Sequence, residues 1–143
     1  MPRKQSNGTS VTRKVPVKPL SKHNGAKSRR KGHTYERNIV KFFKELGFDR
    51  ACTSRQGSRL MDDAKIDLCY VPFNVQCKAV EANINYSNLL KEVDTKIKEL
   101  VPERDEFPIL IFHKRKGENL IITDLSNFEK LIKKCYGVIQ PKI

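Results

Sequence analysis

Three polar side chains, Asp67, Gln76 and Lys78, lie within a strongly apolar stretch of the sequence. Burying an acid, an amide and an amine costs free energy unless they are paired with one another or with a ligand. Residues 65–80 are expected to form two strands joined by a turn near 72–74. Because side chains alternate between the faces of a strand, Gln76 and Lys78 share one face, and Asp67 is expected close to them across the hairpin.

A fourth polar side chain, Glu36, belongs to an amphipathic helix expected over residues 34–46. The apolar residues Ile39 and Val40 follow it at the spacing of one helical turn. Glu36 is therefore expected on or beside the apolar stripe of the helix and not on its charged face. A carboxylate in that position favours a cation nearby, which can be Lys78, a metal ion, or both.

These groups fit metal-dependent phosphodiester hydrolysis. Mg²⁺ takes oxygen ligands, usually one or two protein carboxylates completed by water and substrate phosphate oxygens. Glu36 and Asp67 are the candidate carboxylates, Gln76 offers an amide oxygen, and the backbone carbonyl of Cys77 is a further candidate ligand. Lys78 can position or deprotonate the attacking water, or stabilise charge on the phosphate. The alternative is a structural Asp67–Lys78 salt bridge with Gln76 as a satisfied neighbour.

The elements around these residues are predicted in the order α-β-β-β-α-β-β-α. This order predicts an α/β fold with a central mixed β-sheet flanked by helices. A capping box of Ser126 and Glu129 is expected to start the last helix, and His113 is expected on the surface at the end of a strand. The remaining segments are a polar loop at 56–63, strands at 50–55, 107–115 and 119–123, and a helix at 87–100.

Charge is distributed unevenly along the 143 residues, whose formal net charge is +13. Residues 1–32 contain ten Lys or Arg and no acid, whereas the rest of the chain holds 19 basic and 16 acidic residues. Residues 1–27 are therefore expected to form a flexible basic N-terminal tail, and residues 28–143 a single domain. Such a tail attracts nucleic-acid phosphates, although a purely solubilising tail has the same composition.

The sequence shows no secretory signal and no apolar run long enough for a membrane span, which indicates a cytoplasmic protein without a membrane partner. Its four cysteines form no CxxC pair and are expected to be reduced, small residues of the core.

Four runs, KSRRKGHTYERNIVKFFKELGF, TSRQGS, KIDL and VQCK, resemble the archaeal-type Holliday junction resolvases of the PD-(D/E)XK nuclease superfamily. The resemblance covers residues 27–86, and small phage and archaeal members have about this length. It implies a restriction-endonuclease-like fold and a Mg²⁺-dependent endonuclease, with Mn²⁺ expected to substitute. It further implies a homodimer that resolves four-way DNA junctions by paired symmetric nicks during recombination or repair, in the host cytoplasm if the gene is carried by a phage.

The resemblance also assigns roles to individual residues. Glu36 matches an acid of the first helix that binds the metal or its water shell. Asp67 and Lys78 match the Asp and Lys of the superfamily motif. Arg30 matches a basic residue that contacts the DNA backbone. Ser58 is similar to a loop serine near the scissile phosphate, although the order here is Gly-Ser where the family more often has Ser-Gly.

Further basic residues are expected to contact DNA phosphates. They flank the predicted helix, the polar loop and the Asp67 strand: Arg29, Lys31, Arg55, Arg59 and Lys65. For Arg55 and Arg59, a plain surface charge is an equal alternative.

Gln76 is the departure from the resolvase pattern, which usually has Glu at this position. An amide keeps one acceptor oxygen but carries no negative charge, so metal affinity is expected to be lower. Mrr-like nucleases of the same superfamily carry Gln there, and Asp62, Asp63 or Glu81 can compensate. Two alternatives to the resolvase therefore stay open: another PD-(D/E)XK endonuclease of the Mrr-like kind, and a non-catalytic nucleic-acid-binding protein on a degenerate nuclease fold.

Overall fold

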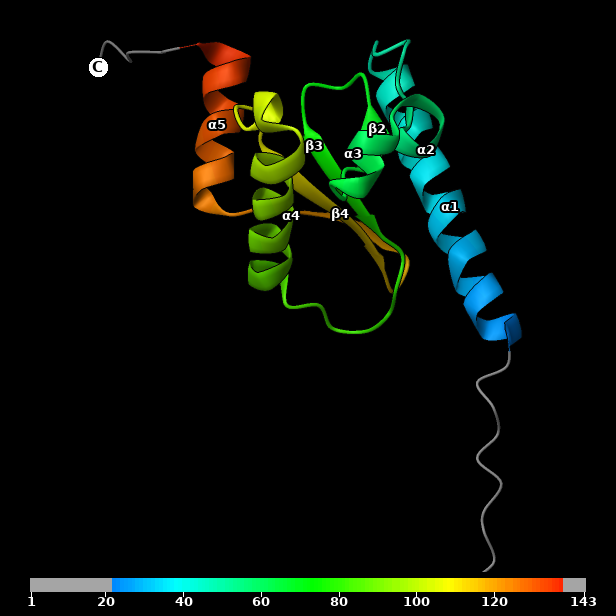
Figure 1. Ribbon diagram of the computed structural model, residues 1–143. Coiled ribbons are helices and arrows are strands. Elements are labelled where there is room, and N and C mark those ends of the chain that lie inside the picture. The colour runs from blue at the N-terminus through cyan, green and yellow to red at the C-terminus, as the bar shows by residue number, and fades with distance from the viewer. Residues whose placement is uncertain (1–21, 138–143) are drawn as a thin grey trace, which may run out of the picture.

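The computed structural model describes residues 22–137 and has the predicted α/β class (Figure 1). The elements are, in order, α1 (Lys22–Glu45), β1 (Cys52–Thr53), α2 (Ser54–Gly57), α3 (Arg59–Asp63), β2 (Leu68–Cys69), β3 (Asn74–Lys78), α4 (Tyr86–Leu100), the 3₁₀ turn η1 (Pro102–Arg104), β4 (Ile109–Arg115), β5 (Glu118–Ile122) and α5 (Leu125–Tyr136).

A three-stranded sheet in the order β3-β4-β5 forms the centre of the fold. β3 runs parallel to β4, with Gln76 opposite Ile111 and Lys78 opposite His113, and β5 is antiparallel to β4. β1 and β2 form a separate antiparallel pair. The predicted mixed sheet is thus confirmed.

Helices α1 and α4 cover opposite faces of the sheet, as Figure 1 shows. On one face, Tyr35, Ile39 and Phe43 of α1 pack against the sheet in a single apolar cluster with Val75 and Phe112. On the other face, α4 contributes Leu89, Leu90, Val93 and Ile97 to a second cluster. The spacing of four residues between the buried positions of α1 fixes the rotation of this helix about its axis. That rotation sets the position of Glu36 relative to the sheet.

The N-terminal boundary differs from the prediction. The first helix begins at Lys22 and not near residue 34, so the part of the predicted tail at residues 22–27 is helical. Residues 1–21 lie outside the described residues. Residues 25–31 are exposed and lack apolar periodicity, so the sequence carries no signal for the first two turns of α1. The helix ends as expected, because Gly47 follows it with a positive φ of 104°.

The segment between α1 and β3 also differs. The predicted polar loop at 56–63 contains the end of α2 and all of α3. The strand predicted at 50–55 is reduced to Cys52–Thr53, because α2 begins at Ser54. The predicted hairpin at 65–80 is not a regular one, because β2 pairs with β1 and β3 pairs with β4. Tyr70, with a positive φ of 61°, turns the chain out of the β conformation between them.

Three local predictions were wrong. Asp124, not Ser126, caps α5, because its side chain accepts a hydrogen bond from the Asn127 N–H. His113 is buried, since both ring nitrogens have partners in Tyr86 Oη and the Val80 carbonyl. Of the cysteines, Cys135 is exposed and outside the core. Within residues 22–137, no helix has the length and apolar character needed to cross a bilayer.

A substitution at Gly57 tests whether α2 packs as closely against Cys52 and Cys69 as the structure shows. A methyl group at this position would lie 2.8 Å from Cys52 Sγ and 3.0 Å from Cys69 Sγ, closer than a carbon atom can approach. We expect Gly57→Ala to lower the free energy of unfolding by about 1–3 kcal/mol. Gly32→Ala is the matched control, because nothing lies within 4 Å of its added methyl. In the helix it should raise stability by about 0.5–1 kcal/mol. Denaturant unfolding measures both, and equal effects would contradict this packing.

Candidate active site

Asp67 is fixed by hydrogen bonds on three sides. Its carbonyl accepts from the Ser54 N–H at 2.8 Å, and its N–H donates to the Val75 carbonyl at 2.7 Å. Its side chain points to β3, where Oδ2 accepts from the Cys77 N–H at 2.7 Å. The Ser54 hydroxyl donates a hydrogen bond to the carbonyl of Ile66, so α2 is also bonded to the residue that precedes Asp67. The sequence places Asp67 beside β3 correctly, but it gives no sign that Ser54 supports it.

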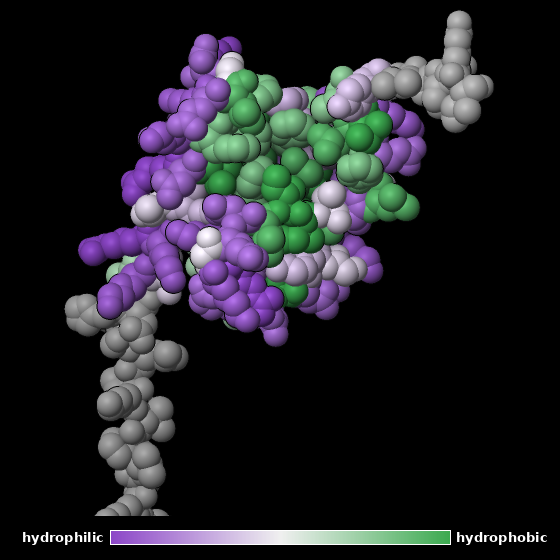
Figure 2. Space-filling view, turned by 180° about the vertical axis from the view of Figure 1, so that it is seen from behind, coloured by the Kyte–Doolittle hydropathy of each residue, from purple (hydrophilic) through white to green (hydrophobic). Residues whose placement is uncertain are grey.

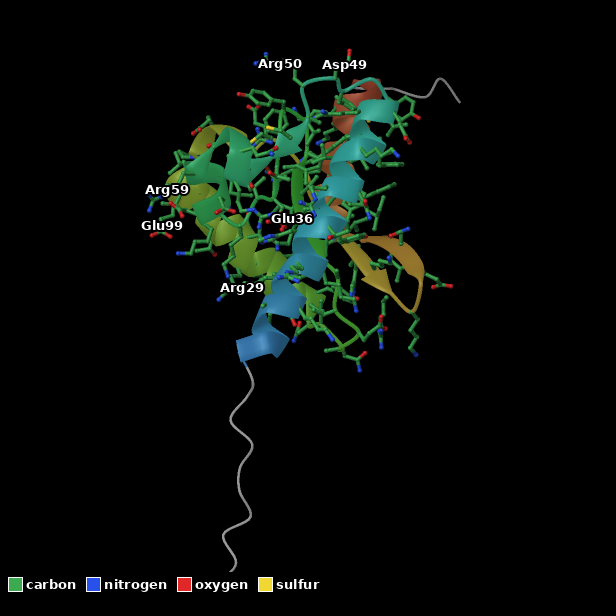
Figure 3. All side chains as sticks on the ribbon, turned by 90° about the vertical axis from the view of Figure 1, so that its right-hand side faces the viewer. Arg29, Glu36, Asp49, Arg50, Arg59 and Glu99 are labelled. Atoms are coloured by element: carbon green, nitrogen blue, oxygen red, sulfur yellow. The ribbon has the colours of Figure 1, made fainter. Side chains whose placement is uncertain are left out.

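Glu36 lies on the part of α1 that faces this segment, and its side chain is only 14% exposed (Figure 3). It forms an ion pair with Arg55 of α2 at 2.5 Å. Arg55 was predicted to bind a DNA phosphate, and in the protein alone its guanidinium pairs with this carboxylate. Lys65 likewise pairs with Glu92 of α4. Two of the predicted phosphate-binding side chains therefore have acidic partners within the protein.

Burial raises the pKa of the Asp67 carboxyl to about 7. The hydrogen bond from Cys77 opposes this shift, the negative charge of Glu36 adds to it, and Lys78 lowers the pKa again. Burial also raises the pKa of Glu36, against the lowering effect of Arg55. Asp62 of α3 is close enough to raise the pKa of both carboxyls. The carboxyls of Glu36 and Asp67 thus lie near each other where burial disfavours their ionised forms.

Gln76 and Lys78, the other two predicted side chains, lie on β3 on either side of Cys77. Gln76 is buried, and its Oε1 has no hydrogen-bond partner among the residues that the structure describes. Lys78 is half-buried, and no ion pair joins it to Asp67 in the described part of the chain. The alternative of a structural Asp67–Lys78 bridge beside a satisfied Gln76 does not describe this arrangement. A buried acceptor without a donor costs about 1–3 kcal/mol unless a ligand occupies it.

This donor set fits a divalent cation. Among residues 22–137, no group of three His, Cys, Asp or Glu side chains could hold a metal ion. The oxygen ligands that Mg²⁺ prefers are nevertheless available, from the carboxylates of Glu36 and Asp67 and from the unpaired amide oxygen of Gln76. Cys77 contributes its N–H to Asp67, and its carbonyl as a ligand stays a prediction.

The remaining predicted residues lie around this centre. Ser58 caps α3, because its hydroxyl accepts from the Met61 N–H at 3.3 Å. Arg59 is exposed at the start of α3, and Figure 3 shows it with Arg29 on the side of α1 away from the β4–β5 hairpin. Arg30 and Lys31 line a cavity on the other side of α1. Helix α1 thus divides the predicted cluster of basic residues between two surfaces.

The raised pKa of Asp67 predicts a pH-dependent stability. The unfolded chain releases this proton near pH 4, whereas the folded protein holds it to about pH 7. The unfolded state therefore binds fewer protons in this interval, and the ionising carboxyl removes stability as the pH rises. Asp67→Asn keeps an oxygen for the Cys77 N–H but stays neutral. In EDTA, we expect it to match the wild type at about pH 4 and to be more stable at about pH 8.

Chemical denaturation across this pH range measures the difference, with the exposed Asp49→Asn as a control for overall charge. Adding Mg²⁺ at the higher pH should stabilise the wild type and leave Asp67→Asn unchanged. An Asp67→Asn protein no more stable than the wild type at about pH 8 would contradict the burial of an ionising carboxyl.

Comparison with protein-family models identifies a family for the chain. Residues 27–143 match the protein family described as "phage putative PDDEXK endonuclease". No curated protein and no solved structure matches the chain. The family match covers most of the sequence, and a mixed sheet between two helices is consistent with the PD-(D/E)XK core. The chain therefore belongs to this phage family of PD-(D/E)XK endonucleases.

Proposed function

We propose that the protein is a Mg²⁺-dependent endonuclease that resolves four-way DNA junctions as a homodimer. One observation supports a catalytic centre most directly: the Cys77 N–H holds the carboxylate of Asp67, and the preceding residue of the same strand, Gln76, buries an amide oxygen that lacks a protein partner. A site that had lost its ligand would gain stability by replacing these groups with apolar ones. Their presence favours a working nuclease over a degenerate, purely DNA-binding fold.

The chemistry follows from where these residues lie. A bound divalent cation supplies Lewis acidity and neutralises charge on the phosphate. Glu36, Asp67 and Gln76 would hold it. Lys78, next to Asp67 on the edge of the sheet, donates a hydrogen bond to a phosphate oxygen or to the attacking water and stabilises the negative charge that grows there. Arg55, paired with Glu36, brings a guanidinium within reach of a phosphate bound at the same place.

Junction resolution requires two cuts placed symmetrically, and a C2 homodimer provides two active sites related in that way. The resemblance to junction resolvases over residues 27–86 supports this substrate. The amide at Gln76 favours a second candidate, an Mrr-like endonuclease that cuts ordinary duplex DNA. Both candidates share the same centre and differ in the DNA structure that they select.

Cleavage of a labelled four-way junction in Mg²⁺, beside a linear duplex and a single strand of the same sequence, separates the two candidates. Paired symmetric nicks confined to the junction are expected. Asp67→Asn should abolish cleavage, by at least about a thousandfold, while junction binding survives. Equal cutting of the junction and the linear duplex would favour the Mrr-like enzyme. Undiminished cutting by Asp67→Asn would rule out this centre.

Gln76→Glu tests whether the amide oxygen is a metal ligand. A third carboxylate beside Glu36 and Asp67 should lower the Mg²⁺ concentration needed for half-maximal cleavage by about fivefold or more, equivalent to about 1 kcal/mol. Without metal, the added negative charge should lower the melting temperature at neutral pH, and Mg²⁺ should restore it. A Mg²⁺ requirement equal to that of the wild type would mean that residue 76 does not contact the ion.

A further inference from the structure

A groove lies between α1 and the β4–β5 hairpin, on the side of the helix away from Glu36. Two adjoining cavities of about 600 and 350 Å³ form it, and they share Tyr35, Asn38 and Lys114 as walls. These volumes are in the range of small-ligand sites. None of the residues assigned to catalysis lines either cavity. The groove is therefore separate from the candidate active site.

The mouth of the groove is strongly basic. Lys27, Arg30 and Lys31 of α1 face Lys114 of β4 across it. Glu81 is the acidic residue among the walls, and its carboxylate accepts a hydrogen bond from the Lys116 N–H at 3.1 Å. Four cations against one acid create a positive potential that attracts a polyanion and repels other basic segments.

The inner end of the groove is apolar and aromatic. Phe42 is 42% exposed and Ile121 is 58% exposed, and they lie over the buried side chain of Phe112. The ring centroids of Phe42 and Phe112 are 6.4 Å apart. The amides of Asn38 and Asn119 are exposed at its rim. Figure 2 shows the corresponding face as an apolar surface bordered by hydrophilic side chains along α1.

We propose that this groove binds single-stranded DNA, with phosphates at the basic mouth and an unpaired base against Phe42. A positively charged groove with an aromatic ring at its base is the arrangement that recognises single strands, because every base can stack on such a ring. A duplex presents phosphates and base edges to a protein and leaves the apolar end of the groove without a partner. Asn38 and Asn119 add donors and acceptors for the edge of the base.

Charge argues against two other occupants. The N-terminal residues 1–21 carry basic side chains and no acids, so the basic mouth repels them. A second copy docked here about a two-fold axis would bring its own basic mouth against this one, so the proposed homodimer uses another face, whereas DNA is a polyanion that fits both ends of the groove. The inference rests on the proposed function only in taking DNA as the ligand. It implies that α1 separates the strand being cut from an unpaired strand held on its other side.

Fluorescence anisotropy with a fluorescein-labelled oligothymidine in EDTA tests the groove without cleavage. Phe42→Leu keeps the apolar contact but removes the ring, and should weaken binding about tenfold. Lys114→Ala should weaken binding severalfold and lower the slope of log affinity against log salt by about 0.7. Matched controls are Tyr70→Leu, an exposed ring outside the groove, and Lys41→Ala, an exposed lysine of α1 that lines neither cavity. Unchanged affinity in both groove variants would overturn the proposal.

Photo-crosslinking locates the base directly and does not depend on a variant that folds. Oligonucleotides that carry 5-bromodeoxyuridine should crosslink to peptides from residues 35–42 or from β5. Crosslinks confined to other peptides would overturn the inference. A Phe42→Leu protein with a different oligomeric state on gel filtration would also overturn it, because that result would assign this face to a second copy of the chain. Asp67→Asn should still bind oligothymidine. Groove binding without any nuclease activity would therefore refute the proposed function while leaving this site in place.

Discussion

The burial of one carboxylate is the constraint on which the rest of the site depends. Asp67 has its backbone paired on both sides, and its side chain accepts the N–H of Cys77 from the neighbouring strand. This geometry holds the carboxylate rigidly but does not compensate for the water that it has lost, so its pKa rises to about 7. A cation beside Asp67 therefore favours its ionised form at neutral pH. The nearby basic residues supply little of that charge, because Arg55 pairs with Glu36 and Lys65 with Glu92.

Helix α1 fixes the second half of the site through packing. Tyr35, Ile39 and Phe43 are buried against the sheet, so the helix cannot rotate without exposing them. Glu36, one position beyond Tyr35, is thereby held at the border between the core and the site. The same packing leaves the opposite border of the helix over the β4–β5 hairpin, where Asn38 and Phe42 line the groove. Helix α1 thus lines both the acidic candidate active site and the basic, aromatic groove.

The sequence predicts the parts of this site that depend on local periodicity. Alternation along β3 separates Gln76 and Lys78 from Val75 and Cys77, and helical spacing puts Glu36 beside the apolar stripe, because both patterns extend over only a few residues. It does not predict the parts that depend on distant partners. β3 pairs with β4, whose residues follow about 35 positions later in the chain, and nothing local to β3 specifies that strand.

The partners of charged and hydroxyl side chains depend even more on distant parts of the chain. Arg55 has the sequence context of a phosphate ligand, yet Glu36 is its partner, and an ion pair between α1 and α2 becomes visible only once those helices are positioned. Ser54 resembles any loop serine until its hydroxyl reaches the carbonyl of Ile66. His113 is polar and near a strand end, but Tyr86 and Val80 satisfy its ring nitrogens and allow it to be buried.

Gln76 shows how stability and function are related in this protein. A core optimised for stability alone would place an apolar side chain opposite Ile111, where the neighbouring elements bury residue 76 almost completely. The amide oxygen there has no partner in the described structure, and nearby, burial and then the negative charge of Glu36 raise the pKa of Asp67. In the proposed function, a divalent cation would satisfy the oxygen and compensate both charges, so these three unfavourable groups would act as its ligands. The groups that cost stability in this part of the core are thus the same ones that we propose bind the metal.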